Sequence, residues 1–94
     1  MPKSNVFYCV EGVLESKIDE EIIIMNLQDG FYYGLDEIAS RVWELLKERS
    51  LSLENLCSIL QDEFDVDNET CQRETLIFLQ SLKEQGLVNE IVDV

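Results

Sequence analysis

The sequence contains no histidine. This excludes Ser-His-Asp and Cys-His catalysis, H-E-x-x-H zinc sites and most transition-metal centres. The sequence also lacks G-x-x-x-x-G-K-[ST], and its four glycines do not form G-x-G-x-x-G, so no phosphate-binding loop is expected. We therefore expect no metal, no cofactor and no catalysis by this chain alone.

Basic residues are scarce: 7 Lys and Arg stand against 20 Asp and Glu, for a formal charge of −13. Affinity for nucleic acids and for anionic membranes depends largely on Lys and Arg. We expect neither as a partner, and the charge favours a partner with a basic surface. The alternative, that the charge serves only solubility, stays open at this point.

Cysteine is limited to Cys9, Cys57 and Cys71, an odd number with no C-x-x-C pair. This spacing suits neither a disulfide framework nor a zinc site. We expect three reduced thiols that are mostly buried and behave as small hydrophobic side chains.

Long apolar runs are also missing. No run of about 18 apolar residues is present, so no transmembrane helix is expected. The first residues lack the apolar core and cleavage site of a signal peptide. The sequence therefore predicts a cytoplasmic protein.

The first third of the chain has the pattern of β-strands. Three are predicted, over Val13–Ile18, Ile22–Leu27 and Phe31–Leu35. Short turns join them, the second at Gln28-Asp29-Gly30, which favours an antiparallel meander. An extended arm over Val6–Val10 is expected before them, and residues 1–5 are expected to be a flexible tail.

The rest of the chain indicates three helices, with N-caps at Asp36, Ser52 and near Asp67. Gly86 is placed to end the third helix in a left-handed conformation. The apolar residues that follow are expected to pack back as a short tail. The prediction is one domain over residues 1–94, of the α+β class, with a three-stranded meander followed by three helices.

The aromatic strand is the best candidate for a binding site, because an exposed strand edge can accept a peptide as an added strand. Phe31, Tyr33 and Leu35 should face the core, and Tyr32 and Gly34 the opposite side. The alternative is that these residues only cap the core. On the third helix Ile77 points away from the buried stripe, either as a single exposed residue or as part of a contact surface.

Two motifs resemble the PqqD-like family, also called RiPP recognition elements. The first is Gly30-Phe31-Tyr32-Tyr33-Gly34-Leu35-Asp36 leading into Val42-Trp43-Glu44-Leu45-Leu46. The second runs from Glu74 through Phe78-Leu79 and Leu82 to Gly86-Leu87. The sequence departs from the family pattern twice: Asp36 stands where Asn is usual, and Thr75 stands where the family has an aliphatic residue.

This resemblance implies a winged helix-turn-helix domain that binds the leader segment of a ribosomally made precursor peptide. The chain is most similar to free-standing lasso-peptide leader-recognition proteins, which present the precursor to a separate leader peptidase of the cysteine-protease type. Their leaders often carry a Tyr-x-x-Pro element. The leader would add to the third strand and pack against the third helix. The peptide-binding residues implied are Phe31, Tyr32, Tyr33, Gly34, Leu35, Cys71, Glu74, Thr75 and Phe78.

Two other functions are compatible with the same scaffold. The first is a peptide chaperone that delivers a precursor to a radical or cyclising enzyme. The second is a winged-helix nucleic-acid binder, which the third helix disfavours because Arg73 and Lys83 stand against Glu69, Glu74 and Glu84. We expect a monomer, with a peptide-free dimer through the open strand edge as the alternative.

Overall fold

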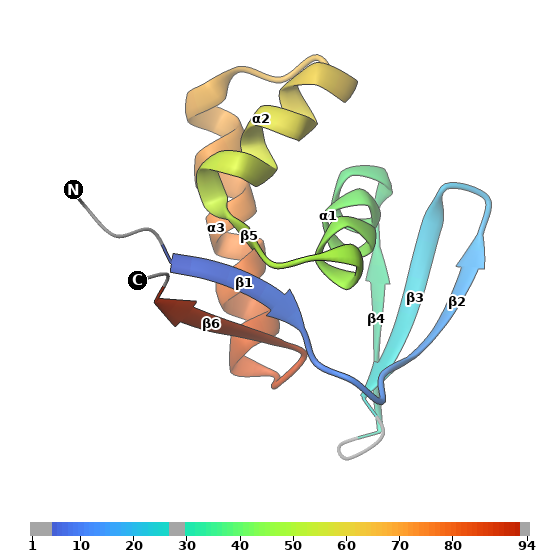
Figure 1. Cartoon of the computed structure of the whole chain (residues 1–94). Helices are drawn as coiled ribbons and strands as arrows, with labels where there is room; N and C mark the ends of the chain where they lie inside the picture. The colour runs from blue at the N-terminus through green and yellow to red at the C-terminus, as the bar shows by residue number, and fades with distance from the viewer. Residues whose placement is uncertain (1–4, 27–29, 93–94) are drawn as a thin grey trace.

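The structure is a computed structural model that describes residues 5–26 and 30–92 (Figure 1). Its elements, in chain order, are β1 (Asn5–Cys9), β2 (Leu14–Ile18), β3 (Glu21–Asn26), β4 (Phe31–Leu35), α1 (Glu37–Glu48), β5 (Leu51–Ser52), α2 (Leu53–Glu63), α3 (Asn68–Glu84) and β6 (Val88–Val92).

The predicted meander is formed by β2, β3 and β4, which lie in that order in an antiparallel sheet. Its strands agree with the predicted ranges to within one residue, because the β-branched run Ile22–Ile24 and the aromatic run of β4 both suit a pleated surface. The three helices follow as predicted. The α+β class and the order of the meander and helices are confirmed.

A second antiparallel sheet was not predicted as such. Its order is β5-β1-β6, and β1 pairs along its whole length with β6, from Asn5 opposite Val92 to Cys9 opposite Val88. The expected arm and the expected C-terminal tail are therefore partner strands from opposite ends of the chain. Asn5, assigned to a flexible tail, is the first residue of β1. The rest of that tail, Leu27 at the end of the second predicted strand, and residues 28 and 29 of the predicted turn lie outside the described residues.

The helix boundaries follow from local hydrogen bonds. The side chains of Asp36, Ser52 and Asp67 accept from the backbone N–H three residues later, at 2.9, 3.1 and 3.0 Å, as N-caps do. At the end of α3, Gly86 has φ of +76°. Its N–H donates to the carbonyl of Lys83, and the N–H of Leu87 donates to Leu82, which makes a Schellman motif. All four predicted boundaries are confirmed.

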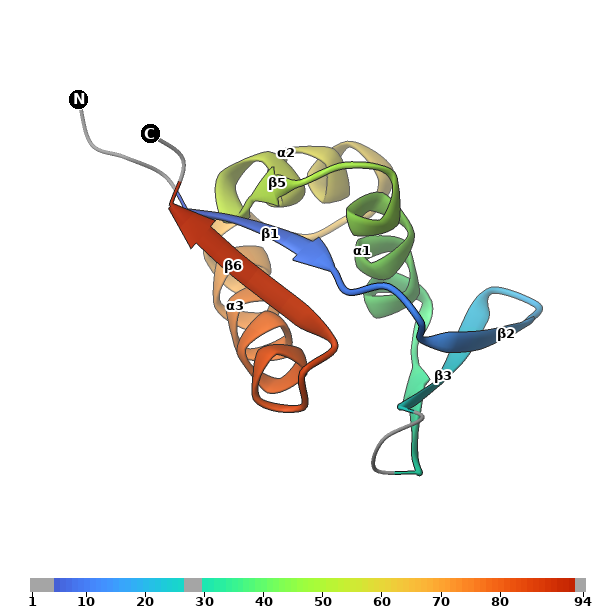
Figure 2. The ribbon, with the colours of Figure 1, turned by 60° about the horizontal axis from the view of Figure 1, so that its bottom comes forward.

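The hydrophobic core lies where the three helices meet the inner faces of the two sheets. Its most deeply buried large side chains are Trp43, Ile24, Leu56, Leu60, Leu79 and Leu87. Figure 2 shows α2 and α3 beside the β5-β1-β6 sheet, and α1 between that part of the molecule and the β2-β3-β4 sheet. Among the described helices, α1 makes the main contacts with β3 and β4, so this sheet is a lateral extension of the core.

Candidate functional site

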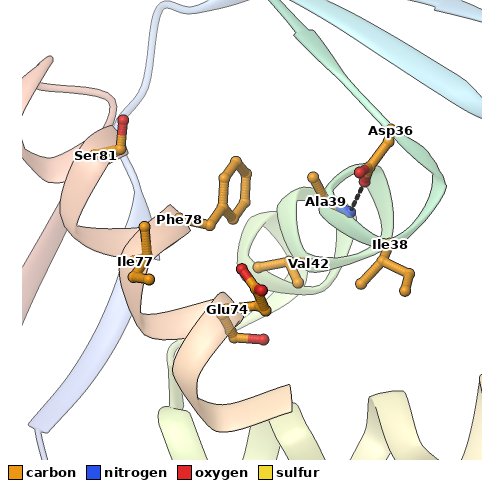
Figure 3. Close-up of a pocket in the computed structure, with 9 residues that line it drawn as sticks. Asp36, Ile38, Ala39, Val42, Glu74, Ile77, Phe78 and Ser81 are labelled. Carbon is orange, nitrogen blue, oxygen red and sulfur yellow. Dashed lines mark hydrogen bonds between the residues drawn. The ribbon is translucent and has the colours of Figure 1, made fainter. Parts of the chain in front are cut away.

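A hollow of about 480 Å³ opens between α1 and α3. Figure 3 shows the Phe78 ring extending from α3 toward α1 at its centre. The hollow is lined by Asp36, Ile38, Ala39 and Val42 from the α1 side, and by Glu74, Thr75, Ile77, Phe78 and Ser81 from α3.

The lining combines an apolar floor with acidic groups. Val42, Ala39 and Phe78 supply hydrocarbon surface, and the small side chain of Ala39 leaves room in front of the Phe78 ring. The charged side chains of the lining are Asp36 and Glu74, both carboxylates. One oxygen of Asp36 already accepts from the N–H of Ala39 as the N-cap of α1. Such a surface can take apolar side chains of a ligand and would favour a nearby cation.

Strand β4 leads directly into this hollow, because Asp36 follows its last residue. In the described chain β4 pairs with β3 on one side only, so its other edge presents unpaired backbone groups. Side chains alternate along it as predicted: Leu35 is buried and Tyr33 is partly buried against the core, while Tyr32 is exposed. Phe31 lies on the inner side by alternation, and it is nevertheless exposed.

Hydrogen bonds of Ser40 and Asn26 fix the β2-β3-β4 sheet relative to α1 and to the end of α3. The hydroxyl of Ser40 accepts from the N–H of Ile22 at 2.9 Å and donates to the carbonyl of Leu35 at 3.0 Å, which ties α1 to β3 and to the end of β4. At the other end of the sheet, the side-chain amide of Asn26 donates to the carbonyl of Gln85 just beyond α3, at 2.9 Å. The sheet is thus tied near both ends to the helices that flank the hollow.

Ion pairs between side chains add further ties. Arg41 of α1 makes two hydrogen bonds to the Glu63 carboxylate of α2, at 2.8 and 2.9 Å, and these lower the pKa of Glu63. Trp43 donates its indole N–H to Glu15 of β2 at 2.9 Å, and Lys47 pairs with the same carboxylate. The first of these contacts fixes α1 against α2, and the others hold β2 against α1.

The structure brings together some of the predicted peptide-binding residues. Glu74, Thr75 and Phe78 line the hollow. Leu35 and Cys71 lie instead in the buried core, and the Cys71 sulfur is 3.9 Å from the Thr75 hydroxyl oxygen. Their assignment to a peptide-binding surface stays a prediction, as does that of the other residues.

Sequence reasoning missed the contribution of α1. Ile38, Ala39 and Val42 pack in or against the core and also border the hollow, although none of them is among the predicted peptide-binding residues. Ile77, which could not be placed from the sequence, lines the hollow and is 60% exposed. Its position off the buried stripe of α3 was the available signal.

Two of the three thiols, those of Cys9 and Cys57, are unsuited to nucleophilic chemistry. Burial raises the pKa of Cys9 and of Cys57 to about 12, so both remain protonated at neutral pH. No group of three or more potential metal-ligating side chains comes together among the described residues. Within the same residues, no helix has the length and apolar character needed to cross a membrane.

Comparison with solved structures shows the same fold. The structure of TbiB1 in complex with the TbiA(beta) leader peptide matches with a TM-score of 0.78 and 33% sequence identity, covering 87% of this chain and 94% of TbiB1. A lasso peptide synthetase B1 complexed with the leader peptide matches with a TM-score of 0.75 and 20% identity, over 88% and 96% of the two chains.

Comparison with curated proteins gives no match. The family described as coenzyme PQQ synthesis protein D (PqqD) matches residues 21–88, which run from the first residue of β3 to the first residue of β6. That span holds both sequence motifs, the hollow and the open strand, and it is well over half of the chain. The chain therefore belongs to the PqqD family.

Proposed function

We propose that this protein binds the leader segment of a ribosomally made precursor peptide, of the lasso class, and presents it to a separate leader peptidase. The observation that carries the proposal is the hollow of α1 and α3 placed directly beside an unpaired strand edge. Family membership supports it, as does the 33% identity to TbiB1, which was solved with a leader peptide.

The peptide would lie extended along β4. Its backbone would pair with the open edge of Phe31–Leu35, as strands add to sheets in many peptide-binding domains. Because strand side chains alternate, every second peptide side chain would point toward α3 and enter the hollow beside Phe78. The Tyr and Pro of a Tyr-x-x-Pro element are three residues apart, so alternation would direct one of them into the hollow and the other to the opposite side of the sheet.

The acidic lining adds a charge preference to this site. Asp36 and Glu74 provide negative charge at the hollow, and the chain as a whole carries −13. A leader with Lys or Arg next to its apolar anchors would gain favourable electrostatics. We expect its affinity to fall as salt is raised, because partly exposed charge pairs are screened.

The protein would act without catalysing a reaction. Holding the leader while the peptidase is also bound makes their encounter effectively intramolecular, and this raises the local substrate concentration. The protonated thiols of Cys9 and Cys57 supply no competing nucleophile. The chemistry would then belong to the partner enzyme.

The test is fluorescence-polarisation binding of a labelled leader from a precursor encoded beside this protein. We expect submicromolar binding to the intact leader, and loss of binding to a leader whose Tyr and Pro are replaced by Ala. Equal binding of the two leaders would show that the hollow does not select these anchors. Absence of binding to the intact leader, both alone and with purified peptidase added, would refute the proposal.

A further inference from the structure

The β2-β3-β4 sheet has a second, outward face that the hollow does not use. Residues paired across an antiparallel sheet share a face, so the outward side of this sheet carries two cross-strand rows of three residues and the pair Ile18 and Glu21. One row is Leu14, Met25 and Tyr32, and the next is Ser16, Ile23 and Gly34. The inward rows hold Ile22, Ile24 and Leu35, which are buried.

The outward face is unusually apolar for an exposed surface. Leu14 is 53% exposed and Ile18 is 58% exposed, and Ile23 and Tyr32 are also exposed. A hollow of about 310 Å³ lies among Leu14, Glu15, Ser16, Ile23, Met25 and Tyr32. Several large apolar side chains gathered on one face are typical of protein interaction sites. We call this surface the outer sheet face.

The charges at the outer sheet face are of one sign. In the three strands, the charged side chain on this side is Glu21, and the adjoining turn adds Asp19 and Glu20. Lys17 of β2 lies on the inward side, where it pairs with Glu44 of α1 at 3.2 Å. The surface is thus an apolar centre with an acidic border, and its complement is an apolar patch bordered by Lys or Arg.

A second copy of this chain does not supply that complement. Each copy carries −13, so packing two outer sheet faces together would bring acidic borders and strongly like-charged molecules into contact. The described elements of the chain itself leave the face uncovered, since α1 lies against its opposite side (Figures 1 and 2).

We infer that the outer sheet face docks the enzyme that receives the peptide, through an apolar patch with a basic border on that enzyme. The inference rests on the proposed function. The leader would use the β4 edge and the side of α3, and the enzyme would approach from the opposite side of the same sheet. Both could then be bound at once, as presentation of a substrate requires.

The test compares Leu14→Glu with Ile91→Glu as a matched control. Leu14 and Ile91 are aliphatic strand residues of similar size, 53% and 48% exposed to solvent. Ile91 lies in β6, in the other sheet. Binding of each variant to the purified leader peptidase encoded beside this protein is measured by biolayer interferometry in the presence of a saturating concentration of leader peptide. Leader affinity is measured separately by fluorescence polarisation.

We expect Leu14→Glu to weaken binding of the peptidase at least about tenfold and Ile91→Glu to leave it within about twofold. Both variants should keep wild-type affinity for the leader, which also reports that they are folded. Ile18→Glu, at a second exposed position of β2, should repeat the loss. Peptidase affinity should also fall as salt is raised.

Three results would overturn the inference. The first is equal peptidase affinity for Leu14→Glu and wild type. The second is absence of peptidase binding by wild-type protein that binds the leader normally. The third is a wild-type dimer in sedimentation that Leu14→Glu converts to monomer, which would make the face a self-association surface. Loss of leader binding by the wild-type protein is a different result, and it would refute the proposed function instead.

Discussion

The two sheets in the described part of this protein have the same number of strands and the same antiparallel pairing, but the extent to which the rest of the molecule covers them differs. In the β5-β1-β6 sheet, Phe7, Leu51 and Val88 are buried against the helices. In the β2-β3-β4 sheet the inward face is also covered, but all five residues of β2 are exposed and the edge of β4 remains open. We will call them the wrapped sheet and the open sheet.

The difference shows how a small domain can divide stability from binding. The wrapped sheet joins the two ends of the described chain and buries apolar area, which is the dominant favourable term in folding. The open sheet keeps an unpaired edge beside the hollow, and such an edge is a hazard unless it has a ligand. We interpret the wrapped sheet as the part that mainly stabilises the fold, and the open sheet as the part that mainly binds.

The largest expected effect comes from truncating the centre of the wrapped sheet. Phe7 is buried in β1, and Phe7→Ala should lower the free energy of unfolding by about 3–5 kcal/mol. Leu14→Ala in the open sheet should change it by less than about 0.5 kcal/mol, because Leu14 is exposed. Urea denaturation followed by Trp43 fluorescence measures both. Similar losses in the two variants would break the comparison.

The next effect should appear in binding alone. Phe78→Asp places a carboxylate in the apolar part of the hollow, and an uncompensated charge there costs several kcal/mol, so leader affinity should fall at least about 100-fold. Leu76→Asp is the matched control, on the same helix but outside the lining. A folded Phe78→Asp that binds the leader normally would remove the hollow from the proposed site.

Ser40→Ala should affect stability and binding together, because its hydroxyl connects the open sheet to α1. The substitution leaves the N–H of Ile22 and the carbonyl of Leu35 without this partner, which should cost about 1–3 kcal/mol of folding stability. We also expect a several-fold loss of leader affinity, since β4 is no longer held against α1. Ser40→Thr, which keeps the hydroxyl, serves as the comparison; affinity lost equally in both variants would show that the two hydrogen bonds of the hydroxyl do not carry the effect.

The smallest effect is on pH dependence, to which the wrapped sheet should contribute at both acid and alkaline pH. Hydrogen bonds from Lys83 and Asn5 lower the pKa of Glu90 in β6 from the ordinary 4.5, and burial raises the pKa of Cys9 in β1 from 9.0 to about 12. A lowered carboxylate pKa stabilises the fold above pH 4.5, and this contribution is lost on acidification. A raised thiol pKa has the opposite sign: its contribution is complete below pH 9.0 and is lost as the pH rises toward 12.

The free energy of unfolding should therefore decline below pH 4.5 and above pH 9.0. Glu90→Gln should flatten the acid limb and Cys9→Ala the alkaline limb, each relative to wild type. An unchanged acid limb in Glu90→Gln would assign acid sensitivity to the other carboxylates with lowered pKa, Glu63 and Asp67.

The sequence by itself determined what depends on neighbouring residues. The caps at Asp36, Ser52 and Asp67, the stop at Gly86 and the strands of the open sheet all arise from contacts within a few positions. The aromatic strand over Phe31–Leu35 was also found in this way, whereas Glu74, Thr75 and Phe78 were implied by the resemblance to the PqqD-like family. Local propensity and side-chain periodicity carry this information, because the interacting groups are close in the chain.

Only the tertiary structure decided the contacts between distant segments. β1 and β6 became a paired sheet because each strand satisfies the backbone groups of the other, from opposite ends of the chain. The hollow also required α1 and α3 to meet, so that Val42 and Ala39 face Phe78 across it. Periodicity shows which face of a helix is apolar, but only packing determines which part of that face is covered and which part is left open to a ligand.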